Sequence, residues 1–94
     1  IYEMARILDT FRRDLPEANL TYNVGLVAGG TPATLADNAE SASALGKTNI
    51  IADSAVARGD LRTLTAEQDA RIRTAMQAIV DASLPGTDAT IRFE

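Results

Sequence analysis

The sequence LTYNVGLVAGGTP, at residues 20–32, decides the fold because it alternates regularly and then stops. Its apolar residues recur at every second position: Leu20, Tyr22, Val24 and Leu26. This alternation predicts a half-buried β-strand over residues 20–28. The segment Gly29-Gly30-Thr31-Pro32 predicts the end of that strand, because glycine and proline interrupt a regular ladder.

Helical patterns stand on both sides of this strand. In residues 1–15, apolar side chains recur at spacings of three and four: Ile1, Met4, Leu8, Phe11 and Leu15. They predict a helix that ends before Pro16. A second helix begins at Thr65, where Thr65 and Gln68 have the spacing of a capping box, and ends at Leu84-Pro85-Gly86. Its apolar face consists of Ile72, Met76, Ile79 and Ser83, widened by Ala75 and Val80.

Two further strands complete the expected order. Residues 49–64 place small apolar side chains on one face and charged ones, Arg58, Asp60 and Arg62, on the other. The tail at residues 89–94 alternates in the same way, whereas residues 33–46 have weak periodicity and predict a long surface loop, with room for a short edge strand.

The resulting order is helix, strand, loop, strand, helix, strand. With one strand missing at the front it becomes β-α-β-β-α-β, an α+β, ferredoxin-like two-layer sandwich. Two helices would then cover one face of an antiparallel sheet. Residues 1–94 are expected to form a single domain. The apolar face of the first helix includes Ile1, and no capping residue precedes it. We therefore expect this domain to be a fragment of a larger protein.

Composition excludes several classes of function. The 94 residues carry a net charge of −4, so the basic excess typical of nucleic-acid binding is missing. No apolar run approaches the ~18 residues of a membrane span. Neither Cys nor His occurs, which removes the commonest general base and the usual ligands of zinc. We therefore expect no nucleic acid, membrane or zinc to be bound by this chain, and no catalysis by the chain alone.

Three local patterns have both a functional and an ordinary interpretation. Gly46-Lys47-Thr48 is similar to the end of a phosphate-binding loop, but Ser41 stands where that loop needs glycine. A turn with a solvated lysine is the simpler interpretation. The carboxylates Asp37, Glu40, Asp53 and Asp60 lack the spacing of a calcium loop and are interpreted as surface groups. The Arg58, Asp60 and Arg62 face is either solvated or able to grip a carboxylate.

Three segments together resemble a known family. They are Val24-Gly25-Leu26-Val27-Ala28-Gly29-Gly30-Thr31, Gly46-Lys47-Thr48-Asn49-Ile50-Ile51-Ala52 and Arg58-Gly59-Asp60-Leu61-Arg62. In their order and spacing, these segments resemble segments of the lid or dimerisation domain of the two-zinc exopeptidase and aminoacylase superfamily. That superfamily includes glutamate carboxypeptidase, succinyl-diaminopimelate desuccinylase and peptidase T. Within it, the chain looks most like the glutamate carboxypeptidase-like peptidases.

The resemblance implies a role outside the catalytic domain. In this family two zinc ions and the general base lie in a separate domain, and the lid closes over the substrate. By position Asn49 would contact the oxyanion and Arg62 would bind the substrate carboxylate. The lid's His would precede Ile1. The chain departs from the family in residues 33–46 and in having Ala52 where proline is common.

The resemblance also implies partners. They are a second copy, joined through a sheet edge and the first helix, the protein's own catalytic domain, and a small peptide or acyl-amino-acid substrate. The alternative is a free-standing ferredoxin-like interaction or regulatory module that dimerises without catalysis.

Overall fold

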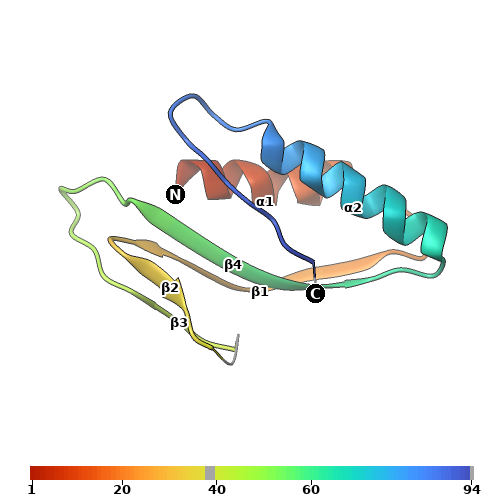
Figure 1. The fold of residues 1–94 in the computed structure, drawn as a ribbon, viewed down its shortest axis with the longest axis horizontal. Coiled ribbons are helices and arrows are strands. Elements are labelled where there is room, and N and C mark those ends of the chain that lie inside the picture. The colour runs from red at the N-terminus through yellow and green to blue at the C-terminus, as the bar shows by residue number, and fades with distance from the viewer. Residues whose placement is uncertain (38–39, 94) are drawn as a thin grey trace. The chain divides into compact units, whose positions relative to one another are not determined.

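A computed structural model describes residues 1–37 and 40–93 (Figure 1). Over these residues the chain forms two helices and four strands in two small sheets. They are α1 (Tyr2–Asp14), β1 (Thr21–Gly30), β2 (Ala33–Leu35), β3 (Ala42–Ala44), β4 (Ser54–Arg62) and α2 (Ala66–Asp81). This is the predicted α+β fold class, and the element order is compatible with a ferredoxin-like sandwich. No helix among the described residues is long and apolar enough to cross a membrane.

The chain divides into two compact units. The first contains Ile1 and residues 22–61, and therefore most of the strands; the second contains residues 2–21 and 62–94, and therefore both helices. Each unit has its own internal packing.

The first unit consists of two antiparallel pairs. Strand β1 pairs with β4, and the approach of Asp53 to Gly30 and of Gly59 to Asn23 shows that the two strands run in opposite directions. Strand β2 pairs with β3 in an antiparallel register that matches Ala33 with Ala44. The predicted strand at residues 20–28 is thus confirmed, and it extends to Gly30.

Residues 33–46 are more ordered than the sequence predicts. Instead of a loop with one short edge strand they contain the β2–β3 hairpin, and residues 38–39 lie outside the described residues. Backbone hydrogen bonds extend this ladder, from Leu45 N to Pro32 O at 3.2 Å and from Ala36 N to Ser41 O at 2.8 Å. Strands of three residues, built from Ala, Ser, Thr and Leu, are too short to produce a detectable alternation.

The strand predicted from residue 49 begins later, at Ser54. Residues 48–49 form a turn, and Ile50 N donates to Lys47 O across it at 3.1 Å. Ile50 and Ile51 are 51% and 93% exposed, so this aliphatic pair is not part of a buried strand. The backbone N–H of Ile50 is thus used within the turn and not in the strand ladder that the aliphatic pair predicts.

The two helices of the second unit pack against each other (Figure 1). Their shared core consists of Ile7, Phe11, Leu15, Ile72, Met76 and Val80. On α2 the predicted face is confirmed at Ile72, Met76 and Val80. On α1 the predicted stripe is wrong in its first half, because the buried row is Glu3, Ile7 and Phe11, while Ile1 is 60% exposed.

Glu3 can belong to the buried row of α1 because its carboxylate accepts several hydrogen bonds there. Arg6 Nε donates to Glu3 Oε1 at 2.8 Å, and Arg6 Nη2 contacts the same oxygen. Leu84 N donates to Glu3 Oε2 at 2.7 Å, and Thr87 Oγ1 does so at 3.2 Å. The Arg6 guanidinium, followed by the Leu84 backbone N–H, lowers the pKa of Glu3 to about 2. A carboxylate with this many donors tolerates burial.

Helix α2 begins as the sequence predicts. Thr65 caps it, and its Oγ1 accepts from Gln68 N at 3.0 Å. In return, Gln68 Oε1 accepts from Leu64 N at 2.9 Å, one residue before the usual partner in a capping box. Beyond the helix, Gly86 adopts a φ of +79°, a left-handed conformation that favours glycine.

The predicted strand at residues 89–94 is not present in residues 89–93, and Glu94 lies outside the described residues. Phe93 instead stacks its ring near the Arg73 guanidinium of α2, 4.9 Å from centroid to Cζ. Alternation favours an extended backbone, but a strand also needs a ladder with a neighbour. Phe93 of the tail thus contacts a helix in place of a neighbouring strand.

Candidate functional site

Asn49 lies in the exposed turn that joins β3 to β4, in the first unit. The turn is closed by the hydrogen bond from Ile50 N to Lys47 O. Its position before β4 follows from the sequence order. An exposed side-chain amide on a turn is free to offer its N–H donors to a bound molecule.

A hollow of about 260 Å³ lies beside this turn and brings together segments that are far apart in sequence. Its lining residues are Ile1, Gly29, Gly30, Thr31, Gly46, Lys47, Thr48, Ile50 and Ala52. Asn49 stands between two of them, Thr48 and Ile50. The Gly-Gly-Thr end of β1 and the Gly-Lys-Thr segment, which sequence analysis treats separately, therefore meet at one surface.

Backbone pairing explains why the two segments meet. Thr31 N donates to Leu45 O at 2.6 Å, and Leu45 N donates to Pro32 O. Gly30 allows this approach, because a Cβ at that position would overlap the carbonyl oxygen of Leu45. Thr48 lies in a turn, and the next element is the strand β4, whereas a phosphate-binding loop leads into a helix. The nucleotide interpretation of Gly46-Lys47-Thr48 therefore fails.

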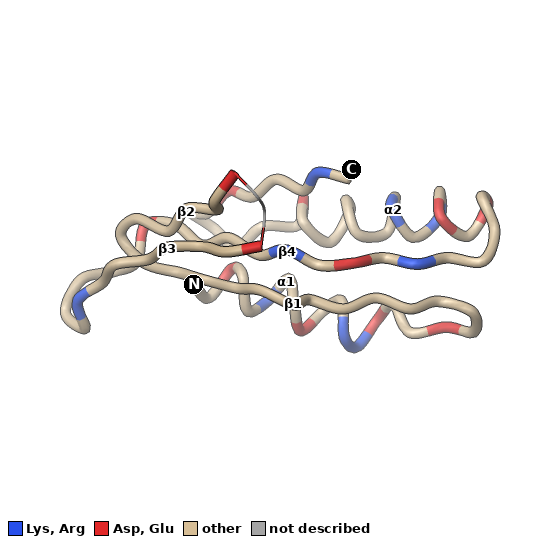
Figure 2. Tube along the Cα trace, turned by 90° about the horizontal axis from the view of Figure 1, so that it is seen from below, with Lys and Arg blue, Asp and Glu red and all other residues tan. Residues whose placement is uncertain are grey.

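Arg62 lies at the end of β4 and is exposed. Asp60, also exposed, and Arg58, which is half-buried, lie two and four residues before it on the same strand. Figure 2 shows the resulting succession of basic, acidic and basic residues along β4. All three side chains take part in interactions within the structure. Arg62 belongs to the second unit and Asn49 to the first, so their meeting over one substrate stays a prediction.

The carboxylates do not assemble into a metal centre within the described part of the chain. No group of three or more His, Cys, Asp or Glu side chains there could hold a metal ion.

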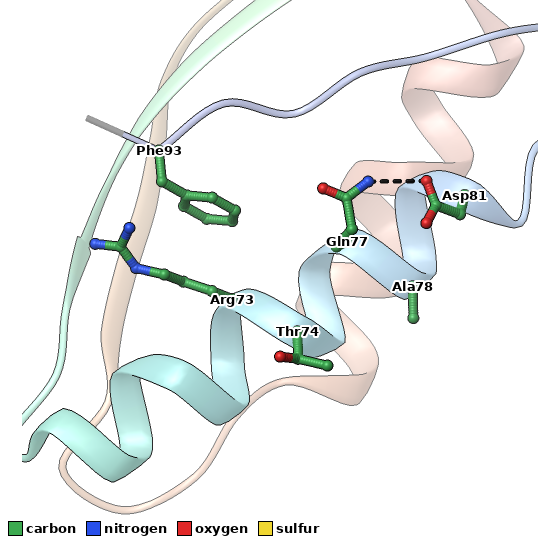
Figure 3. A pocket seen from close by; sticks show the side chains of 6 residues that line it. All are labelled: Arg73, Thr74, Gln77, Ala78, Asp81 and Phe93. Carbon is green, nitrogen blue, oxygen red and sulfur yellow. Dashed lines mark hydrogen bonds between the residues drawn. The ribbon is translucent and has the colours of Figure 1, made fainter.

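A second hollow, of about 420 Å³, lies along α2 in the second unit (Figure 3). Phe93 and Arg73 face each other at one end, and Gln77 Nε2 donates to Asp81 Oδ1 at 2.8 Å at the other. Arg73 also pairs with Asp69 at 2.8 Å. The charged side chains that line this hollow, Arg73 and Asp81, thus already have partners. The sequence does not predict the hollow, because it depends on the contact between the tail and α2.

The α+β element order, with Gly-Gly-Thr at the end of β1 and Asp-Leu-Arg at the end of β4, agrees with the lid or dimerisation domain that the sequence resembles. The family model of the peptidase dimerisation domain matches residues 1–88. The chain therefore belongs to the peptidase dimerisation domain family of the M20 peptidases, as the resemblance predicts, and its role is peptidase-associated dimerisation. No curated protein and no solved structure matches the chain.

Proposed function

We propose that this chain is the dimerising and substrate-capping lid of a zinc-dependent, glutamate carboxypeptidase-like peptidase or amidohydrolase. The reaction is hydrolysis of an amide bond next to a substrate carboxylate. The family match over residues 1–88 carries the proposal, because it includes both Asn49 and Arg62.

Each of the two residues has the chemistry that its role requires. The planar guanidinium of Arg62 can bind a carboxylate through two parallel hydrogen bonds. The amide of Asn49 can donate to the oxygen that becomes negative when water attacks the amide carbonyl. Both residues are exposed, which suits contact with a substrate held by another domain.

Zinc belongs to the catalytic domain in this proposal. The chain has no His or Cys, and its described residues contain no cluster of metal-binding side chains, so its own residues do not fit the ion. The lid contributes donors to the substrate and a surface for self-association.

Kinetics of the complete enzyme test the two site residues. Arg62→Ala should mainly raise KM. The loss of a charged pair shielded from water should weaken the binding free energy of the substrate by about 2–4 kcal/mol. Asn49→Ala should mainly lower kcat, by about 2.7–4 kcal/mol for one oxyanion donor. Arg58→Ala, on the same face of β4, is the control and should have much less effect. The roles are wrong if both variants keep normal kcat/KM, or if both simply unfold.

Self-association is proposed to use a sheet edge and α1. Strands β1 and β4 form a two-stranded sheet, whose outer edges can pair with another strand. Tyr2, at the start of α1, is 87% exposed, and tyrosine is a residue type enriched at protein–protein interfaces. We expect Tyr2→Lys to weaken the homodimer in sedimentation experiments. Ile51→Lys, at a position that is 93% exposed but on neither element, is the control. A monomeric wild-type protein would contradict this part of the proposal.

A further inference from the structure

We propose that the hollow beside Asn49 binds a small aliphatic carboxylate, with Lys47 as the residue that holds its charge. None of the contacts in this proposal involves Asn49 or Arg62, so it does not rest on the catalytic roles proposed above.

Lys47 differs from the other basic residues of the chain. It is the only lysine, and it forms no ion pair or hydrogen bond through its side chain within residues 1–37 and 40–93. The arginines all have partners: Arg6 binds Glu3, Arg12 and Arg13 bind Asp9, Arg71 binds Glu17 and Arg73 binds Asp69, and Arg58, Arg62 and Arg92 also take part in interactions. No acidic residue lines the hollow, so the ammonium group is not neutralised there.

The polar part of the hollow has further donors for a carboxylate. Thr48 lines it and has no partner for its hydroxyl among the described residues. Thr31 Oγ1 accepts from Asp53 N at 3.4 Å and keeps its own O–H to donate. A lysine ammonium with neighbouring hydroxyl groups is a suitable set of donors for one oxyanion.

The apolar part argues for an organic anion and against an inorganic one. Ile1, Ile50 and Ala52 line it, and the glycines at 29, 30 and 46 leave space beside them. Water occupies roughly 30 Å³ per molecule in the liquid, so about 260 Å³ holds a molecule of several non-hydrogen atoms. A carboxylate with a short alkyl group matches both the polar and the apolar part of the hollow. Its alkyl group would contact the two isoleucines, and its carboxylate would contact Lys47.

The test uses the complete protein, depleted of metal so that no carboxylate binds to zinc, and titrates it calorimetrically with acetate, butyrate and inorganic phosphate. We expect saturable binding of butyrate, about three- to fifteenfold tighter than that of acetate, because two methylenes leave water at least in part. Lys47→Met should weaken butyrate about tenfold or more through loss of a charged hydrogen bond. Ile50→Ser should weaken butyrate but not acetate.

Two further measurements locate the binding. Arg71→Met removes the same charge from the second unit, at an exposed pair with Glu17, and should leave butyrate binding unchanged. Butyrate should also protect Lys47 from acylation by a limiting dose of reagent, as measured by mass spectrometry of its peptide. Sedimentation and circular dichroism check that the variants keep the wild-type fold.

The proposal is overturned if butyrate shows no saturable binding, or if Lys47→Met binds it as the wild type does. It is equally overturned if phosphate binds more tightly than butyrate and acetate equals butyrate, because the hollow would then attract any anion by charge alone. A kinetic failure of the Asn49 and Arg62 variants is a separate result and leaves these measurements unaffected.

Discussion

Gln68 offers a sharp test of how the second unit is held together, because it is only 8% exposed and uses both ends of its amide. Its Oε1 accepts from Leu64 N at 2.9 Å, and its Nε2 donates to Ala18 O at 3.0 Å. The side chain thereby ties the start of α2 to the segment between α1 and β1. Gln68→Met keeps the side chain's length and removes both hydrogen bonds, while the backbone N–H of residue 68 still donates to Thr65.

The free-energy cost follows from these two bonds. Each contributes about 0.5–1.5 kcal/mol net, and a buried partner left without a hydrogen bond costs about 1–3 kcal/mol. Both bonds are partly buried, so the lower half of that range applies to each, and the thioether recovers some of the loss by burying apolar surface. We expect the free energy of unfolding to fall by about 2–3 kcal/mol.

Urea unfolding measures this loss. With a slope of about 1.5 kcal/mol per molar, the midpoint should fall by about 1.3–2 M. Gln77→Met is the matched control, because Gln77 lies on the exposed side of the same helix and, among the described residues, its side chain bonds only to Asp81. This change should alter stability by less than about 0.5 kcal/mol. Equal midpoints for Gln68→Met and Gln77→Met would refute the reasoning. Gln68 also binds the backbone N–H of Leu64, two residues after the proposed substrate-binding Arg62. Loss of this bond should loosen the position of Arg62, so Gln68→Met should raise KM in the complete enzyme, but by less than Arg62→Ala.

Three further predictions use contrasts within the structure. Glu3 has its pKa lowered to about 2 from 4.5, so its contribution to stability is complete above pH 4.5 and is lost as the pH falls toward 2; Glu3→Gln should flatten this acid limb of Tm against pH. Ile72→Ala should cost about 2–5 kcal/mol in urea unfolding, because Ile72 is 3% exposed, whereas Ile51→Ala, at a 93% exposed position, should cost less than about 0.5 kcal/mol. Gly30→Ala should destabilise by about 1–3 kcal/mol through overlap with a facing backbone oxygen, and Gly46→Ala, with no atom within 4 Å of the new Cβ, should not.

The elements that sequence analysis located correctly are those whose signals are local. Thr65 and Gln68 are three residues apart, and their mutual positions follow from the geometry of a helix start. The alternation before Gly29 likewise depends only on neighbouring residues. The family resemblance also rests on spacing along the chain, which explains why it could be drawn without a structure.

The wrong predictions concern residues whose structure depends on a partner distant in sequence. The spacing of apolar residues predicts Ile1, Met4 and Leu8 on the buried face of α1 and does not point to Glu3. Donors from Leu84 and Thr87, more than 80 residues away in sequence, allow its burial. Alternation predicts a strand at residues 89–94, but Phe93 contacts Arg73 on α2. A periodic pattern reports which side chains share a face, and it does not report what that face will contact.

The same limit applies to the hollow beside Asn49, and it shows what kind of signal would have found it. Taken alone, Gly46-Lys47-Thr48 lacks the first glycine of a phosphate-binding loop and predicts a turn with a solvated lysine. The hollow exists because Leu45 exchanges backbone hydrogen bonds with Thr31 and Pro32, which brings the end of β1 to Lys47. Two glycine-containing segments that each end in threonine, joined by a hairpin, are therefore more informative as a pair than either is alone. The pairing puts an unpartnered cation beside an apolar surface, and that combination, rather than the glycine pattern, points to an aliphatic carboxylate.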